Sequence, residues 1–292
     1  MRGWGYETFW RGELWVRHFT FDSLEDYLDY LASAPVLPPF DRGCASEAGS
    51  AEFTETESLE EALALARFGW HEGLNTLVNM VEAVKRALDL KLEARRTFHD
   101  YVGFAPDVKA YLEGSPLSMV NKPNPPREKF TIYMNTSCDG SARRERIYAR
   151  GAVVLAVAEV LEMMGYLVDL RLFELSFVDK DVHFSEFRLK APDERVNLAK
   201  MHFPLCHPSW VRRLNFRLIE TSPNMTDGWA GSYGIPADAA LTRAVLGLGE
   251  GDVLVPTVDE LGVAGEDVLA DAQRLFDLVN VRLPADKQLR YR

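Results

Sequence analysis

The sequence predicts an α/β protein in which a doubly wound, mostly parallel sheet is flanked by helices, with an α-rich N-terminal part. Three observations support this prediction. Residues 130–134 alternate as a β-strand does, residues 141–164 show an apolar helix pattern, and residues 166–173 alternate again. A strand that a helix joins to another strand of the same sheet is usually parallel to it. These residues are therefore expected to form a parallel βαβ unit.

Residues 1–120 are predicted to form the α-rich N-terminal part. A short strand or hairpin is expected over residues 10–21, where aromatic and β-branched residues gather. Helix patterns follow over residues 24–31, 59–68 and 74–95. Ser23 and Ser58 precede the first two patterns at N-cap positions, each with an acidic residue three positions later. Residues 41–57 are rich in Gly, Ala, Ser, Glu and Thr, which predicts a loop or a mobile linker.

A proline-rich connection is expected to separate that part from the α/β domain. Residues 121–129 contain Pro123, Pro125 and Pro126, which favour extended backbone. The α/β domain is assigned to residues 130–292.

The helix that connects the two strands of the βαβ unit has recognisable ends. Asp139 or Ser141 can cap its first turn, and Gly165 suits the left-handed position that ends a helix. Gly151 lies inside the helix, where glycine costs about 1 kcal/mol relative to alanine. It is therefore expected to permit a close approach of another segment.

Strand and helix patterns continue after residue 173. Strands are expected over residues 183–189, 215–220 and 252–255, and helices over residues 194–202, 238–248 and 266–279. Residues 221–235 resemble a loop, in which Trp229 and Tyr233 lie among glycines. These aromatic residues could stack on a base, grip a peptide or fold back on the sheet.

The composition excludes several functional classes. The 292 residues carry a formal net charge of -11 with a pI near 5.1, which argues against a general nucleic-acid binder. No apolar run approaches the roughly 18 residues that span a bilayer, and the N-terminus lacks the order of a signal peptide. The three cysteines form neither a disulfide framework nor a CxxC pair. We therefore expect a cytoplasmic protein without a membrane segment.

Residues 130 to about 280 resemble a von Willebrand factor A-type (VWA-like) domain, a doubly wound α/β fold. In that family the first strand ends in Asp-x-Ser-x-Ser, whose oxygens bind Mg²⁺. Here Asn135 replaces the first aspartate, Ser137 matches, and Asp139 replaces the second serine. The whole chain is also similar in layout to uncharacterised proteins encoded by tailed phages, a resemblance that implies no activity.

The resemblance implies a degenerate magnesium site. A distant threonine and aspartate complete the family's site, and the candidate ligands here are Asn135, Ser137, Asp139, Thr226 and Asp227. Hard oxygen ligands suit Mg²⁺, but a single carboxylate in the loop is a poor cage. The alternative is that Asp139 and Ser141 only cap the helix. No other cofactor is expected.

The same loop is a candidate anion site, because ligands of parallel sheets bind beyond the carboxyl ends of the strands. A glycine and a helix N-terminus favour an anion, and arginines in a first helical turn oppose the helix dipole unless they meet an anion or an acidic partner. The candidate residues are Ser137, Asp139, Gly140, Ser141, Arg143, Arg144 and Arg146. Alternatively, the arginines form a solvated turn that pairs with Glu145 and nearby acids. No P-loop motif is present.

Other reactive residues give weaker signals. His202, Cys206 and His207 do not have a standard zinc spacing. Cys138 and Cys206 could act as nucleophiles beside a histidine, but the sequence shows no such neighbour, so buried and inert cysteines are expected.

Two functional hypotheses follow. The first is a non-catalytic binding or assembly protein with a protein partner or a second copy of itself, located in the host cytoplasm or the virion if a phage encodes it. The second is an enzyme that acts on a phosphorylated or nucleic-acid substrate at the loop of residues 135–141.

Overall fold

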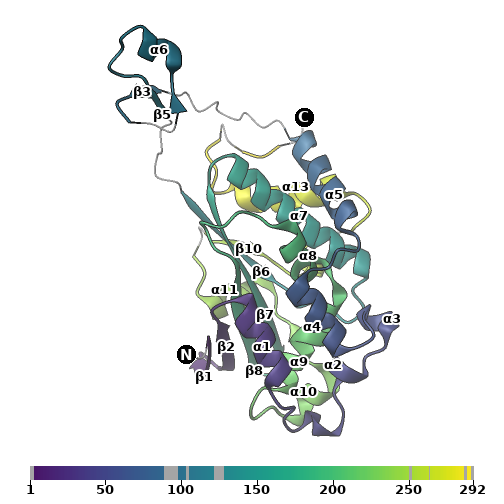
Figure 1. Cartoon of the computed structure of the whole chain (residues 1–292). Coiled ribbons are helices and arrows are strands. Elements are labelled where there is room, and N and C mark those ends of the chain that lie inside the picture. Colours follow the sequence, from purple (N-terminus) through teal and green to yellow (C-terminus); the bar gives the residue numbers. More distant parts are fainter. Residues whose placement is uncertain are drawn as a thin grey trace.

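The computed structural model describes residues 3–88, 98–102, 105–121, 128–249, 252–262, 264–285 and 288–290. A seven-stranded central sheet is flanked by helices, and a three-stranded sheet lies apart from it (Figure 1). The central sheet has the order β1 (Trp4–Arg11), β2 (Leu14–Phe21), β8 (Asp181–Lys190), β7 (Leu167–Val178), β6 (Lys129–Asn135) and β10 (Val253–Val255), with β9 (Ile235–Pro236) paired to β7. The predicted α/β class, with helices flanking a central sheet, is confirmed.

Parallel and antiparallel pairings both occur in this sheet. β6 pairs in parallel with both β7 and β10, and β2 pairs in parallel with β8. Antiparallel pairing joins β1 to β2, β7 to β8, and β9 to β7. Only Asp179 and Lys180 separate β7 from β8, so this pair is a tight hairpin rather than a helical crossover.

The predicted βαβ unit is confirmed. α7 (Arg144–Met163) joins β6 to β7, and the two strands pair over seven consecutive residues. Gly165 has a φ of 95°, in the region expected where a helix ends at a glycine. A Cβ atom at Gly151 would lie 2.3 Å from the Leu205 carbonyl oxygen, so this glycine does permit a close backbone approach.

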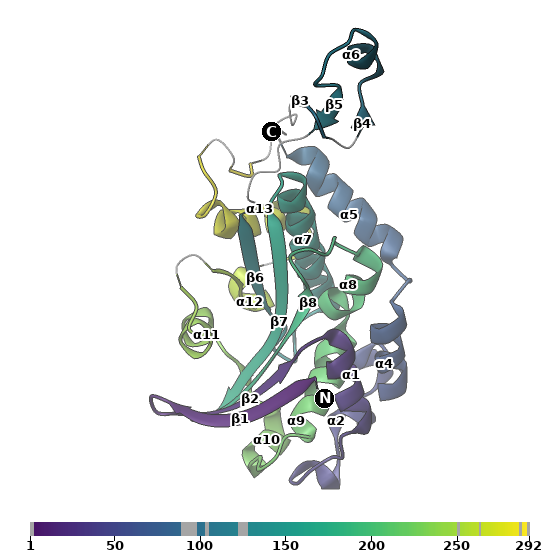
Figure 2. The same ribbon diagram turned by 60° about the vertical axis from the view of Figure 1, so that its left-hand side comes forward.

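Helices cover both faces of the central sheet (Figure 2). On one face α7 packs against α5, α8 and α13, with α1 and α4 beyond them. On the other face α11 covers a smaller core. The bounds are α1 (Leu24–Ser33), α4 (Leu59–Phe68), α5 (Leu74–Ala87), α8 (Leu198–Cys206), α11 (Ala239–Leu246), α12 (Val258–Leu261) and α13 (Val268–Asn280).

The N-terminal strands complete the sheet of the C-terminal half. The strand or hairpin expected over residues 10–21 is present as a hairpin, but it begins earlier, because β1 starts at Trp4; β2 pairs with β8 over seven residues. Residues 1–120 and 130–292 therefore share one sheet across the expected boundary, of which residues 122–127 lie outside the described residues.

A small module projects from the body of the protein (Figure 1). Its sheet has the order β3, β5, β4, and a short helix precedes the last strand. The bounds are β3 (Phe98–Asp100), β4 (Ala105–Pro106), α6 (Val108–Leu112) and β5 (Met119–Asn121). The helix expected over residues 74–95 ends earlier, at Ala87, because Leu88 already has extended backbone; residues 89–97 lie outside the described part of the chain.

The prediction of a mobile linker over residues 41–57 is wrong. This segment follows η1 (Phe40–Arg42) and contains α2 (Ala45–Ala48) and α3 (Ala51–Thr54). The buried guanidinium of Arg213 donates to the carbonyl oxygens of Ser46, Gly49 and Thr56. Composition missed this because the arginine that satisfies these carbonyl groups lies more than 150 positions away.

The strand predicted over residues 215–220 is also wrong. This segment is helical, as the end of η2 (Trp210–Asn215) and then α9 (Phe216–Glu220). Its apolar residues, Phe216, Leu218 and Ile219, are too few for periodicity to distinguish a strand from a buried helix. The predicted loop that follows contains α10 (Asp227–Ser232).

No helix in the described ranges has the length and apolar content that crossing a bilayer requires.

Candidate functional site

A pocket of about 290 Å³ opens beyond the carboxyl end of β6. The loop after β6 forms one wall, η2 and α9 form a second, and the end of α10 with β9 forms a third. The lining residues are Phe53, Ser137, Cys138, Asp139, Gly140, Glu174, Ser176, Val211, Arg212, Asn215, Phe216, Ile219, Ser232, Tyr233, Gly234, Ile235 and Pro236. The pocket therefore lies where ligands of parallel sheets usually bind.

The polar wall of the pocket is an extension of β7. This strand continues past the end of β6, whose last residue pairs with Phe173. Leu170 and Leu172 lie in the main core, and the next residues of the same alternation are Glu174 and Ser176. The inward face of β7 therefore changes from apolar to polar at the point where it reaches the pocket.

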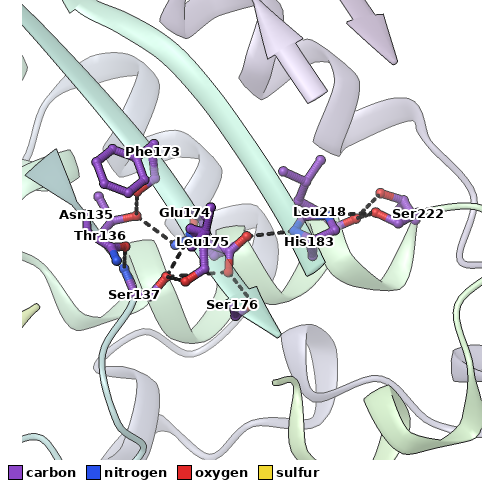
Figure 3. A network of polar contacts seen from close by, with 12 residues as sticks. Asn135, Thr136, Ser137, Phe173, Glu174, Leu175, Ser176, His183, Leu218 and Ser222 are labelled. Atoms are coloured by element: carbon purple, nitrogen blue, oxygen red, sulfur yellow. Dashed lines mark hydrogen bonds and ion pairs between the residues drawn. The ribbon is translucent and has the colours of Figure 1, made fainter. Parts of the chain in front are cut away.

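Glu174 belongs to a buried chain of polar contacts (Figure 3). One carboxylate oxygen lies 2.6 Å from Nδ1 of His183. The other accepts from the hydroxyl of Ser176 at 2.5 Å and lies 3.4 Å from that of Ser137. Because these groups come from two strands and the loop, the carboxylate is held in one position at the pocket wall.

The chain of contacts continues from His183 to Ser222, whose hydroxyl lies 2.9 Å from Nε2. Serine, histidine and glutamate in this order resemble a hydrolytic triad. However, Ser222 is fully buried, its hydroxyl donates to the Leu218 carbonyl oxygen at 2.7 Å, and it does not line the pocket. A substrate cannot reach it, so the network orients Glu174 rather than forming a nucleophile.

Two residues of the predicted metal motif are used within the fold. The side-chain oxygen of Asn135 accepts from the backbone N–H of Ser137 at 2.9 Å, and its amide lies 3.5 Å from the Ala237 carbonyl oxygen. The Ser137 hydroxyl donates to the Leu175 carbonyl oxygen at 3.2 Å and accepts from the Leu175 N–H at 3.1 Å. These bonds fasten the loop to β7.

Asp139 is exposed beside the pocket mouth. It accepts from the hydroxyl of Ser141 at 2.5 Å and from its backbone N–H at 2.8 Å, and these bonds hold the pKa of the Asp139 carboxyl below its usual range. Neither residue caps the helix, because α7 begins at Arg144 with Arg143 at the N-cap position. The capping alternative is therefore wrong, and Asp139 instead stabilises a local turn.

The structure does not bring the predicted magnesium ligands together in the pocket. Thr226 and Asp227 are exposed at the start of α10 and do not line it. Within the described ranges, no group of three or more His, Cys, Asp or Glu side chains could hold a metal ion. Magnesium binding stays a prediction from the resemblance.

The arginines of the predicted anion site face acids outside the pocket. The ion pairs are Arg143 with Glu266 (4.0 Å), Arg144 with Glu55 (3.4 Å) and Glu145 (3.0 Å), and Arg146 with Asp259 (2.8 Å). None of the three arginines lines the pocket. This arrangement agrees with the alternative of a basic turn that pairs with nearby acids.

Arg212 is the cationic side chain in the pocket wall, and the fold uses most of its donors. Its guanidinium donates to the carbonyl oxygens of Phe53 and Ala142, both at 2.6 Å, and to that of Gly140 at 3.4 Å. It also lies over the Phe53 ring at 4.3 Å. Arg212 therefore fastens α3 and the loop after β6 to η2.

The apolar wall is built on a stacked pair of rings, Phe216 and Tyr233, whose centroids are 4.2 Å apart. The Tyr233 hydroxyl donates to Glu220 at 2.6 Å and accepts from the Ala45 N–H at 2.8 Å. Burial, together with the adjacent Glu220 carboxylate, raises the pKa of Tyr233. Tyr233 therefore stays protonated and acts as a wall rather than a base.

The remaining sequence candidates lie mostly within the fold. Burial raises the pKa of both thiols, and Cys206 is fully buried as expected, whereas Cys138 is partly exposed and lines the pocket. Trp229 is fully buried and its indole N–H donates to Asp181 at 3.0 Å, so this ring folds back on the protein.

Sequence reasoning missed the residues that define the pocket, Glu174, Ser176 and Arg212. For the first two a signal existed, because polar residues alternate with apolar ones inside an otherwise apolar strand. For Arg212 no local signal existed, since its carbonyl partners come from distant segments.

The family described as a domain of unknown function (DUF7192) matches residues 11–280, a span that contains every residue lining the pocket. Searches of curated proteins and of solved structures found no match. Because the matched span covers most of its length, the chain belongs to the DUF7192 family.

Proposed function

We propose that this chain is a non-catalytic binding or assembly protein, and that its pocket accepts a basic side chain of a protein partner. The observation that carries the proposal is the charge of the lining. Two carboxylates, Glu174 and Asp139, lie in the wall, whereas the guanidinium of Arg212 already donates to backbone carbonyl groups.

A cationic ligand fits this lining better than a phosphate does. Glu174 presents a fixed, buried carboxylate, and Asp139 presents an exposed one at the mouth. An ammonium or guanidinium group offers only donors, and charge-assisted bonds to carboxylates are the strong ones. A phosphate would meet two like charges, and the three nearby arginines face other acids.

The size and apolar lining suit one long side chain. Ligand pockets begin at about 300 Å³, so this one lies at the small end. The stacked Phe216 and Tyr233 rings provide an apolar surface for the stem of a lysine or arginine. The overall charge of -11 also favours a basic partner.

The VWA-like, doubly wound assignment is part of this proposal. It is supported by the parallel β6–α7–β7 unit and by helices on both faces of the sheet. The antiparallel β7–β8 hairpin departs from the expected winding. A phage origin, with the protein in the host cytoplasm or the virion, rests on resemblance in layout, and gene neighbourhood tests it.

The pocket can be tested with single side chains as probes. NMR titration with N-acetyl-lysine amide and N-acetyl-arginine amide is expected to shift the signals of residues 137–140 and of Tyr233, and inorganic phosphate is not. Asp139→Asn, an exposed change that leaves the buried network intact, should weaken binding of the cationic probes, and Glu174→Gln should weaken it further. Glu113→Gln, in the projecting module, is the matched control.

Binding of phosphate in place of the cationic probes would overturn the proposal. It would favour the alternative of an enzyme that acts on a phosphorylated or nucleic-acid substrate at residues 135–141.

A further inference from the structure

The outer edge of the central sheet is an open strand. β1 pairs with β2 on one side, and none of the described strands pairs with its other side. The β1–β2 hairpin extends beyond the helices that cover the sheet (Figure 2). An unpaired edge of eight residues is a ready template for another strand, and natural proteins usually shorten, bulge or cover such edges.

The register of the hairpin determines which backbone groups face outwards. Asp22 donates its N–H to the Gly3 carbonyl oxygen at 2.8 Å. The even-numbered residues of β2 therefore direct their backbone N–H and C=O groups toward β1. Trp15 donates its N–H to the Lys180 carbonyl oxygen at 2.8 Å, on the β8 side. Backbone groups alternate in direction along an antiparallel pair. By the register, the β1 residues that direct their backbone groups to the open edge include Tyr6, Thr8 and Trp10.

The strand is complementary to itself around Phe9. Residues 7–11 read Glu-Thr-Phe-Trp-Arg, and the side chains of Glu7, Phe9 and Arg11 share one face. If two copies pair antiparallel with Phe9 opposite Phe9, Glu7 of each copy lies opposite Arg11 of the other. Opposite charges in this position stabilise a strand pair, and the Glu7 side chain is 68% exposed.

The same alignment satisfies the backbone. Thr8 then lies opposite Trp10 of the other copy, and both residues direct N–H and C=O groups to the open edge, so they form hydrogen-bonded pairs. A shift that centres the pairing on Glu7 would place two glutamates face to face, which is unfavourable. The register centred on Phe9 therefore satisfies the backbone directions and also pairs opposite charges.

We propose that β1 pairs with β1 of a second copy of this chain, joining two central sheets into one across a two-fold axis. The interface consists of five directly opposed residue pairs, far fewer than the roughly 20–30 residues a side of a stable interface. The association is therefore weak and depends on protein concentration.

Sedimentation velocity over a concentration series tests this association in the full chain. The wild-type protein is expected to shift from monomer to dimer as concentration rises. Glu7→Arg alone or Arg11→Glu alone turns two attractive contacts into two repulsive ones, and either should weaken the dimer by roughly tenfold or more. The double variant, Glu7→Arg with Arg11→Glu, restores opposite charges and should restore the dimer.

Glu13→Arg is the matched control, because it changes a charge in the hairpin turn and breaks a surface pair with Lys180 without touching the proposed interface. It should dimerise as the wild type does. A wild-type protein that stays monomeric at every concentration would overturn the proposal. Equal dimerisation by the single charge variants would overturn it too, because the contact would then lie elsewhere.

Discussion

The guanidinium of Arg213 donates to the Thr56 carbonyl oxygen at 2.7 Å, across 157 positions of sequence. The same side chain donates to the Thr56 hydroxyl at 2.7 Å and to the carbonyl oxygens of Ser46 and Gly49. One buried cation thus organises a segment whose composition resembles a linker, and this segment carries Phe53 into the pocket wall.

Replacing Arg213 should therefore cost far more stability than replacing a surface arginine. Arg213→Met leaves several buried carbonyl groups without a donor, and we expect a loss of about 3 kcal/mol or more in the free energy of unfolding. Urea denaturation measures this loss. Arg67→Met, which removes an exposed pair with Asp29, is the control and should cost about 1 kcal/mol or less. Similar losses in both variants would show that Arg213 is not the anchor.

Gly151→Ala should destabilise the protein although alanine is the better helix former. The added methyl group would lie 2.3 Å from the Leu205 carbonyl oxygen and 2.5 Å from the Cys206 sulfur, so α7 and α8 must move apart. Overpacking of this kind costs about 1–3 kcal/mol. Gly231→Ala in α10, where a Cβ meets nothing within 4 Å, should leave the melting temperature unchanged or raise it. A neutral Gly151→Ala would show that the helices can separate without cost.

Sequence periodicity and glycine positions correctly predicted the elements whose structure depends on neighbouring residues in the chain. The βαβ unit follows from periodicity, and Gly151 and Gly165 were correctly interpreted because a missing Cβ has a geometric meaning at each position. The pocket could not be predicted in the same way. Glu174 and Arg212 act through partners from β8 and α3, and a single sequence does not show which distant carbonyl or imidazole group will meet a buried charge. The strand predicted over residues 215–220 was wrong because the few apolar residues of this short segment fit a buried helix equally well.

Two buried histidines, His202 and His207, contact the Trp70 ring and should make the protein sensitive to mild acid. Burial, with His202 nearby, lowers the pKa of His207 from its ordinary value of 6.5 to about 3, and burial also lowers the pKa of His202. Between pH 6.5 and 3 the unfolded chain therefore binds more protons than the folded one. The free energy of unfolding should fall as pH falls, by up to about 1.4 kcal/mol per pH unit from His207 alone.

Chemical denaturation at pH 7, 6, 5 and 4 measures this dependence. In His207→Asn the amide oxygen can still accept from the Ser209 N–H, as the imidazole does at 3.1 Å, but nothing titrates there. The variant should lose less stability than the wild type between pH 6 and 4. Equal slopes would show that His207 is not the group responsible.

Magnesium should not stabilise the folded protein, because Asn135 and Ser137 use their side chains within the fold and Asp227 does not line the pocket. A ligand at 100 times its Kd would stabilise by about 2.7 kcal/mol, which a thermal shift assay detects. We expect the melting temperature to be the same in about 10 mM Mg²⁺ as in EDTA. A melting temperature several degrees higher in Mg²⁺, with no such increase in Asp139→Asn, would instead support a metal site that includes Asp139.

The three arginines at the start of α7 should be dispensable for ligand binding. Two of them are about two-thirds exposed, at 65% and 66%, and exposed ion pairs contribute about 0.2–1 kcal/mol each. We expect the combined variant Arg143→Ala, Arg144→Ala and Arg146→Ala to remain folded, to lose only about 1–2 kcal/mol of stability, and to bind N-acetyl-lysine amide as the wild type does. Thermal denaturation and NMR titration provide both measurements. If inorganic phosphate instead stabilises the wild type and this stabilisation disappears in the variant, the arginines form an anion site after all, and the enzymatic alternative becomes the better account of the loop after β6.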